Sequence, residues 1–377
     1  MKILKRVMLA FIFIILLVAG AVYVYFKTAP QIGGNLQGDR LERAKKAANF
    51  QDGIFQNTVE TKMSMSFTDL RKTLAHYLFA DKSDKYPKST IETIPFDKSA
   101  FSNANDSSIH LTWFGHSTIL LKVDGVTLLI DPVLEGERAS MFSFMGPKRF
   151  PYTEYPSIED LPKIDAVMIS HDHYDHLDYA TIKLLKEKVN QFYLPLGVGA
   201  HFESWGVPKE NIVEVEWWQE TSIQGLKLAF TPTRHFSGRG FGDRFKTLWG
   251  SWVILGKEKS IYFSGDSGYF PGFKEIGEKY GPFDLTFMEC GAYNEAWSEI
   301  HMFPEQTAQA HLDLKGKLLM PIHWGKFDLA LHPWKESVNR LARSAEEADI
   351  PLFTPEIGQL ISLTDSDETE PWWKKVD

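Results

Sequence analysis

The chain has 377 residues, of which 44% are hydrophobic and 24% charged, and its formal net charge is -8. This composition is typical of a globular protein with a substantial core, and it excludes a disordered, collagen-like or mostly membrane-embedded chain. An acidic balance does not suit nucleic-acid binding, which needs a basic surface, so no nucleic-acid partner is expected. The single cysteine, Cys290, excludes an intrachain disulfide and a cysteine-rich zinc knuckle.

The N-terminus carries an uncharged run of 20 residues, from Val7 to Phe26, bracketed by Arg6 and Lys27. As a helix this run spans roughly 30 Å, the thickness of a bilayer core. A cleaved signal peptide usually has a shorter apolar region. We therefore predict an uncleaved single-pass membrane anchor, with residues 1–27 forming a cytoplasmic stub and the transmembrane helix. A cleaved signal peptide and a buried core helix are the alternatives.

The charges that flank this run predict its orientation. Lys2, Lys5 and Arg6 precede the run, whereas only Lys27 and Arg40 follow it closely. Because basic residues favour the cytoplasmic side, the body of the protein is expected on the non-cytoplasmic side of the membrane. A wider window that includes residues 43–46 removes this bias.

Residues 28–84 are predicted to be a linker followed by a helical segment. The stretch 31–57 is polar and contains glycine, with a short helix expected near 40–50. Beyond it, Phe67, Leu70, Leu74 and Leu78 recur at helical spacing. This second helix either packs on the body of the protein or lies against the membrane beside the anchor.

From residue 85 to residue 377, strands and helices alternate without an internal linker, which predicts one α/β domain with mixed sheets. Asp124-Gly125 between two apolar runs predicts a two-residue hairpin of the primed type. Strands are expected at 109–114, 118–123, 126–130, 164–170, 192–195, 226–231, 251–255, 260–263 and 285–289. Helices are expected at 179–189, 273–280, 304–314 and 333–348.

A dense group of chemically active residues directly follows the apolar run 164–170. It reads His171-Asp172-His173-Tyr174-Asp175-His176. Because side-chain alternation ends with the strand, His171 and His173 can share one metal ion while Asp175 and His176 reach a second. Imidazole and carboxylate ligands without a thiolate suit Zn²⁺, with Fe or Mn as alternatives. The alternative reading is a polar surface loop.

Three more potential ligands follow at the ends of later strands. His235 comes after 226–231, Asp266 after 260–263, and His323 after the apolar residues 318–320. Each residue alone is more often structural. Together with the first four, they occur in an order that predicts a two-metal site.

The pattern His-x-His-x-Asp-His, then His, Gly-Asp and His, resembles the metallo-β-lactamase fold superfamily of binuclear hydrolases over about residues 109–364. The resemblance implies a four-layer αββα sandwich, preceded here by the transmembrane helix. It also implies two Zn²⁺ ions, or Fe or Mn. The implied ligands of the first ion are His171, His173 and His235, those of the second are Asp175, His176 and His323, and Asp266 bridges the two.

Softer motifs resemble the family of N-acylphosphatidylethanolamine-hydrolysing phospholipases D. They include Gly115-His116-Ser117-Thr118, Asp131-Pro132-Val133, Gly146-Pro147-Lys148-Arg149-Phe150, Gly265-Asp266-Ser267-Gly268-Tyr269 and Ile322-His323-Trp324-Gly325. This resemblance implies a membrane phospholipid as substrate, cleaved to phosphatidic acid and N-acylethanolamine. Ser267 in place of threonine and the N-terminal anchor depart from that family.

The resemblance also suggests roles in catalysis. Two cations about 3.5–4 Å apart lower the pKa of a shared water toward roughly 7. Asp266 is expected to fix their spacing and to orient that water. His301, which is similar to a further active-site histidine of the family, is expected to bind the phosphate or protonate the leaving oxygen. Asp131 is expected to brace the metal loop, and His116 to be structural.

Substrate contacts are expected from the loop 140–150, in which Met141 and Phe144 provide apolar surface and Lys148 and Arg149 provide positive charge. A phospholipid needs a wall for its acyl chains and a counter-charge for its phosphate, although a packed loop has the same composition. The alternative functions are hydrolysis of a small lactone, ester or β-lactam on the same fold, and a non-catalytic protein with structural metals. The sequence leaves the oligomeric state open.

Overall fold

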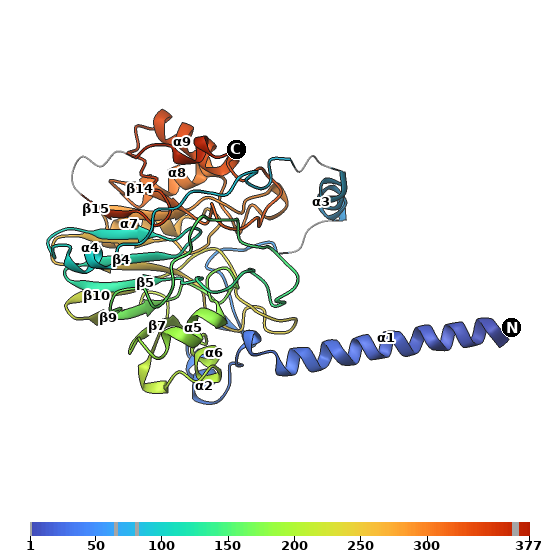
Figure 1. Ribbon diagram of the computed structural model, residues 1–377. Helices are drawn as coiled ribbons and strands as arrows, with labels where there is room; N and C mark the ends of the chain where they lie inside the picture. The colour runs from blue at the N-terminus through green and yellow to red at the C-terminus, as the bar shows by residue number, and fades with distance from the viewer. Residues whose placement is uncertain (1, 64–66, 80–82, 364–368) are drawn as a thin grey trace.

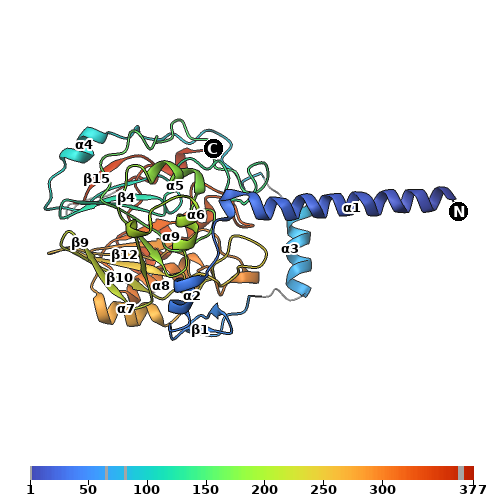
Figure 2. The ribbon, with the colours of Figure 1, turned by 90° about the horizontal axis from the view of Figure 1, so that it is seen from below.

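A computed structural model describes residues 2–63, 67–79, 83–363 and 369–377. Two sheets pack face to face and helices cover both outer faces, so the body has the four-layer αββα arrangement that the resemblance implied (Figures 1 and 2). In Figure 2, α5 lies on the outer face of the sheet that holds β4 and β15, and α7 on the outer face of the sheet that holds β9, β10 and β12.

The first sheet has seven strands in the order β15-β3-β4-β5-β6-β7-β8. Antiparallel pairing runs from β15 to β5 and parallel pairing from β5 to β8. The turn between β4 and β5 is the predicted hairpin, since Val123 pairs with Val126 and both turn residues, Asp124 and Gly125, have positive φ. The strands are β3 (His110–Trp113), β4 (Ile119–Val123), β5 (Val126–Ile130), β6 (Ala166–Met168), β7 (Phe192–Pro195), β8 (Ile212–Val215) and β15 (Leu360–Ser362).

The second sheet has six strands in the order β14-β13-β12-β11-β10-β9. Strands β9 to β12 pair antiparallel, whereas β12, β13 and β14 are parallel. The carboxyl ends of β10, β12, β13 and β14 consequently meet at one edge. The strands are β9 (Glu220–Ile223), β10 (Leu226–Thr231), β11 (Ser251–Leu255), β12 (Ser260–Phe263), β13 (Leu285–Glu289) and β14 (Leu319–Ile322).

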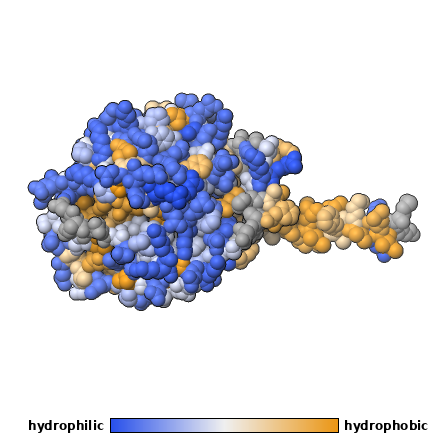
Figure 3. Space-filling view, turned by 90° about the horizontal axis from the view of Figure 1, so that it is seen from above, coloured by the Kyte–Doolittle hydropathy of each residue, from blue (hydrophilic) through white to orange (hydrophobic). Residues whose placement is uncertain are grey.

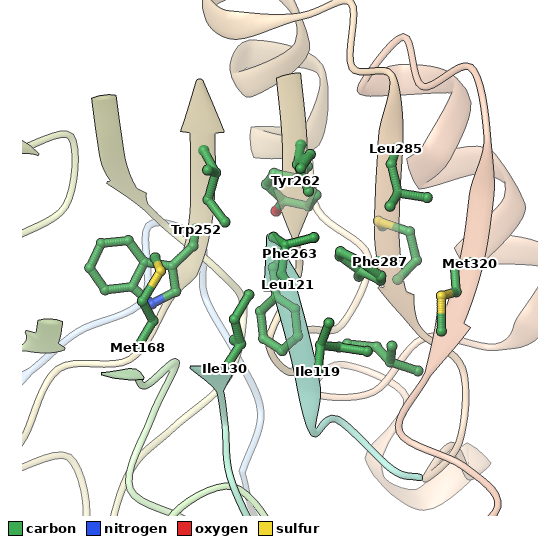
Figure 4. Packing of buried hydrophobic residues seen from close by; sticks show 14 of the residues in the cluster. Ile119, Leu121, Ile130, Met168, Trp252, Tyr262, Phe263, Leu285, Phe287 and Met320 are labelled. Carbon is green, nitrogen blue, oxygen red and sulfur yellow. The ribbon is translucent and has the colours of Figure 1, made fainter. Parts of the chain in front are cut away.

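Side-chain alternation explains why the first sheet is covered on both faces. In β4, Ile119 and Leu121 belong to the core between the sheets, whereas Leu120 belongs to the second core, under the outer helices. Figure 4 shows Ile119 and Leu121 facing Phe263 and Phe287 of the opposite sheet. Apolar residues on both faces of a strand are typical of a sheet buried on both sides.

The outer helices start and end close to the predicted positions. Asp178 caps α5, where its carboxylate accepts hydrogen bonds from the backbone N–H groups of Ala180 and Thr181, and Pro304 opens α8 as predicted. The helices are α4 (Lys98–Asn103), α5 (Tyr179–Leu185), α6 (Gly199–Ser204), α7 (Gly272–Tyr280), α8 (Pro304–Asp313) and α9 (Glu336–Glu347), with 3-10 turns η1 (Pro30–Ile32), η2 (Lys209–Asn211), η3 (Glu295–Trp297) and η4 (Trp372–Lys375).

The segment 31–57, predicted as a linker, instead packs on the body. Its short helix α2 (Gly38–Ala44) ends earlier than expected, and the strands β1 (Phe50–Gln51) and β2 (Ile54–Phe55) form a small hairpin. Phe55 is fully buried, and the guanidinium of Arg40 pairs with Glu203 and Glu214 at 2.8 and 2.6 Å. The polar residues that suggested a linker are the ones that make these ion pairs.

Two helices leave their apolar residues exposed instead of packing them on the body. Helix α1 (Lys2–Thr28) includes one stretch, Ile3–Thr28, that is long and apolar enough to cross a membrane, and none of it is buried. In Figure 3 it is a hydrophobic rod that projects from a mostly hydrophilic body. Helix α3 (Phe67–Phe79) confirms the predicted helix, but Phe67 is 75% exposed and Leu74 54% exposed, so the helix touches the body at η3 without packing its apolar stripe there.

Candidate metal centre

The predicted ligands converge because they all follow strands that end at the same edge. The loop 171–176 leaves β6 of the first sheet, His235 follows β10, Asp266 follows β12 and His323 directly follows β14. Parallel strands bring their carboxyl ends to one edge, so these residues meet although they are up to 152 positions apart, from His171 to His323.

The first group of ligands consists of His171, His173, His235 and Asp266. Nδ1 of His173 lies 2.9 Å from Nε2 of His171 and 3.2 Å from Nε2 of His235. Oδ2 of Asp266 lies 3.7 Å from Nε2 of both His171 and His235. Three imidazole nitrogens and a carboxylate oxygen thus surround one point.

The second group contains Asp175, His176 and His323, with His116 beside them. Nε2 of His323 lies 3.1 Å from Oδ2 of Asp175 and 3.0 Å from Oδ2 of Asp266. Nε2 of His176 lies 3.2 Å from Oδ1 of Asp266. Asp266 therefore faces both groups, as a ligand that bridges two ions must.

The nitrogen and oxygen atoms of these side chains are better placed to bind a metal ion than to form hydrogen bonds with one another. Among the described residues, Nε2 of His176 and Oδ1 of Asp266 are buried and, although 3.2 Å apart, are not aligned for a hydrogen bond with each other or with another group. Buried polar atoms normally have partners, so such orphaned atoms that point at one place fit a cation. The arrangement is a binuclear His/Asp metal site, and its ligands suit Zn²⁺, Fe or Mn.

A second layer of hydrogen bonds fixes these ligands. Nδ1 of His176 lies 2.7 Å from Oδ2 of Asp131, whose other oxygen accepts the backbone N–H of Ser170 at 2.7 Å. Nδ1 of His235 donates to the carbonyl of Ile300 at 2.9 Å. With their Nδ1 atoms occupied in this way, both imidazoles present Nε2 to the centre. Asp131 thus lies where the sequence analysis expected it, behind a ligand.

His116, which was predicted to be structural, lies directly beside the second group of metal ligands. Its Nε2 is 2.8 Å from Oδ2 of Asp175, and its ring is fully buried. Its φ of 55°, with 42° at Asp131 and 66° at His323, is left-handed. Non-glycine residues rarely adopt this conformation, and clusters of such strain are typical of functional sites. The GHST motif therefore positions a side chain that orients a ligand.

The electrostatics keep Asp266, His171 and His235 in the charge states that metals need. Burial opposes ionisation of Asp266, but the imidazoles of His176 and His323 outweigh it and hold the pKa of this carboxyl well below its usual range. Burial lowers the pKa values of His171 and His235 well below theirs. At neutral pH the carboxylate is therefore charged and both imidazoles are neutral, with lone pairs available. At His176 and His323 burial is outweighed by the nearby carboxylates of Asp266 and Asp175, which raise the pKa instead, to about 10 at His323, so these two imidazoles must release a proton when a metal ion binds.

A pocket of about 310 Å³ opens over the two groups. His301 lies on its wall, and Nδ1 of this residue is 3.2 Å from Oε2 of Glu289, a fully buried carboxylate. The other oxygen of Glu289 accepts the backbone N–H of Met302 at 2.7 Å. Glu289 thus holds His301, and a ring nitrogen of His301 lies within 4.8 Å of ligand atoms of Asp266 and His323, so His301 can reach the metal centre as well as a substrate. The pocket is lined by Lys62, Met63, His173, Asp175, Phe236, Asp266, Ala292, Ala296, Trp297, Ile300, His301, His323 and Leu329.

The family described as "Beta-lactamase superfamily domain" matches residues 127–324, which include both ligand groups except His116. The chain belongs to the metallo-β-lactamase superfamily. An uncharacterized protein of Mycobacterium tuberculosis is 41% identical over 335 residues, 88% of each chain. N-acyl-phosphatidylethanolamine-hydrolyzing phospholipase D 1 of Caenorhabditis elegans is 32% identical over 280 residues, 69% of this chain and 78% of its own.

Solved structures agree on the fold. A metallo hydrolase of Ignicoccus hospitalis superposes with a TM-score of 0.51 at 21% identity, over 69% of this chain and 100% of its own. At this level of identity the likeness concerns the fold alone. With the ligand geometry and the family match, this chain is a metal-dependent hydrolase of the metallo-β-lactamase fold.

The loop 140–150, which was predicted to bind substrate, does not line the pocket over the metal ligands. The backbone carbonyl of Met141 accepts hydrogen bonds from Tyr25 and Gln31, at the end of α1. Phe144 is 73% exposed and Lys148 is exposed as well, whereas Arg149 stacks on Tyr155 and donates to the carbonyl of Leu134 at 3.0 Å.

The pocket uses other residues, which the sequence analysis missed. Phe236, Trp297 and Ile300 supply its apolar wall, and Lys62 supplies a cation at its rim. Phe236 and Ile300 are the sequence neighbours of His235 and His301. Their position next to predicted site residues was the feature of the sequence that could have identified them. Nothing in the sequence marked Lys62, which lies in the segment 28–84 that was predicted to be a linker followed by a helical segment.

Proposed function

We propose that this protein is a membrane-anchored phosphodiesterase that hydrolyses N-acylphosphatidylethanolamine to phosphatidic acid and N-acylethanolamine. The activity named for the Caenorhabditis elegans relative supports the substrate. The pocket supports it as well, because an apolar wall next to a cation suits an acylated phosphodiester. We also propose that α1 remains attached as the anchor and that the catalytic domain lies on the non-cytoplasmic side.

One observation carries this proposal: a buried arginine ties the end of α1 to the metal loop. The guanidinium of Arg239 donates to the carbonyl of Gln31 at 2.8 and 2.9 Å, three residues beyond α1. It also donates to the carbonyl of Asp172, inside the ligand loop, at 2.5 Å and to that of Leu177, just after the loop, at 2.8 Å. The metal centre is thereby tied to the end of α1. If α1 is the anchor, as proposed here, a lipid substrate is met there at high effective concentration.

The residues of the pocket have definite parts in the proposed reaction. When bound, two divalent cations lower the pKa of a shared water and neutralise charge on the phosphoryl group. Lys62 lies where it can pair with a phosphate oxygen. A water oxygen attaches to phosphorus, the bond from phosphorus to the ethanolamide oxygen breaks, and His301, held by Glu289, can deliver a proton to that leaving oxygen.

Incubation of the metal-loaded full chain with N-palmitoylphosphatidylethanolamine in mixed micelles made with ¹⁸O-water tests this proposal. Mass spectrometry should find N-palmitoylethanolamine without label and phosphatidic acid with one ¹⁸O atom, and phosphatidylcholine should serve as the comparison substrate. No lipid turnover, together with ready turnover of a lactone, ester or β-lactam, contradicts the phospholipase proposal and leaves the hydrolase fold in place.

The proposed orientation has a separate test in cells. Alkaline phosphatase, which is active only after export, should be active when fused to the C-terminus of the full chain. Green fluorescent protein that folds only in the cytoplasm should stay dark at the same position. The opposite pair of results places the metal centre inside the cell.

A further inference from the structure

Helix α3 has its apolar side turned outward. Phe67, Leu70, Leu74 and Leu78 recur at spacings of three and four residues and form one stripe. Their exposed fractions are 75%, 49%, 54% and 58%. A helix on the surface of a globular protein normally buries such a stripe against the core.

The opposite, polar side of α3 faces the body. Asp69, Lys72 and Thr73 line a hollow of about 410 Å³ together with Asn294 and Glu295 of the pocket region. This helix touches the body at η3, and the four residues of its apolar stripe stay about half exposed or more, so the body does not cover the stripe. An amphipathic helix in water is expected to turn its apolar side toward the protein, and α3 does the reverse. An apolar medium next to the exposed side of α3 would account for this orientation.

The direction of α1 indicates which medium that is. Both helices lie on the same side of the body, and α3 is strongly foreshortened in Figure 1 but seen along its length in Figure 2, whereas α1 lies lengthwise in both. The axis of α3 is therefore steeply inclined to that of α1. If α1 crosses a bilayer, α3 lies along the plane of the membrane, as interfacial helices do.

Two loops add apolar side chains around the exit of α1. Phe142 stacks on Tyr25 at 5.1 Å between ring centroids, and its neighbour Phe144 is 73% exposed. Phe241, which is 81% exposed, contacts Phe26 at 4.6 Å. Tyrosine at the end of a spanning helix, such as Tyr25, is typical of the membrane interface. These loops mark the level on α1 at which the membrane surface begins.

We propose that α3 is a second membrane contact, which inserts Phe67, Leu70, Leu74 and Leu78 into the acyl-chain boundary of the same leaflet that α1 enters. The partner is the lipid bilayer itself. Arg71, which is exposed next to the stripe, can then pair with lipid phosphates. The inference rests on α1 being a membrane anchor and not on the identity of the substrate. Because Lys62 and Met63 lead into α3 and line the metal pocket, this contact turns the pocket toward the headgroups.

Depth-dependent fluorescence quenching tests this contact in the full chain. The native Cys290 is fully buried, so a cysteine introduced on the surface can be labelled selectively. We would label Leu74→Cys on the apolar stripe and, as the matched control, Lys72→Cys on the opposite side of α3. Each variant is reconstituted in phosphatidylcholine–phosphatidylglycerol vesicles that contain a lipid spin-labelled near the top of its acyl chain.

The label at position 74 should be quenched at least about twofold more strongly by the spin-labelled lipid than the label at position 72, which aqueous iodide should quench instead. A third variant, Val18→Cys in the middle of α1, reports on the anchor. Equal quenching at positions 72 and 74 with strong quenching at 18 overturns the inference and leaves the anchor. Absence of lipid quenching at 18 and 74 overturns both. Lipid hydrolysis is measured separately, so its failure leaves this membrane contact intact.

Discussion

Gly291→Ala is expected to destabilise the protein by about 4 kcal/mol or more, because the site leaves no room for a methyl group. A Cβ atom at Gly291 would lie 1.6 Å from the carbonyl oxygen of His323 and 3.2 Å from its Nδ1. The first contact is with backbone, which cannot rotate away. Either β14 separates from the 290–292 segment or His323 leaves the metal centre, so bound metal should fall along with stability.

Urea unfolding of the wild type and the variant measures this effect. Gly242→Ala is the matched control, since a Cβ atom there meets no described atom within 4 Å. The control should unfold within about 0.5 kcal/mol of the wild type. Equal stabilities for the two variants would mean that β14 and the 291 segment are not packed as the structure has them.

Asp266→Asn is expected to lower the rate of hydrolysis at least about 100-fold. The amide keeps the shape of the side chain but removes the negative charge and one of the two oxygen ligands. Oδ1 of Asp266 faces His176 while Oδ2 faces His323, His171 and His235, so a single substitution affects both ligand groups. Loss of the bridge should reduce the affinity for at least one ion.

Turnover of any substrate that the wild type hydrolyses measures this loss. Asp160→Asn, which removes a carboxylate from an exposed position, should retain the wild-type rate. If Asp266→Asn also keeps the wild-type rate at saturating metal, Asp266 does not bridge the ions.

The metal ligands were predictable for two reasons. Each of them follows a strand, and a cluster of histidine and aspartate residues at strand ends has few functions other than metal binding. Short sequence motifs also predicted the local structure correctly where a single local interaction determines it. The turn at Asp124-Gly125 needs two positive φ angles, and Asp and Gly supply them. The start of α8 at Pro304 follows from the missing N–H group of proline.

The errors came from contacts between segments far apart in the chain. Segment 31–57 reads as polar, yet Arg40 finds its partners at Glu203 and Glu214, more than 160 positions later. The loop 140–150 has the composition of a lipid site but does not line the metal pocket, so its contact with a substrate stays a prediction. For α3, the spacing predicted the helix, but it did not tell which medium covers the apolar stripe.

Elemental analysis of the purified full chain tests the central claim most directly. The geometry of the two ligand groups predicts about two ions of zinc, iron or manganese per chain. Asp266→Asn, measured beside it, should hold about one ion or fewer. A metal content near zero in wild-type protein that remains fully active as a hydrolase would contradict the binuclear centre.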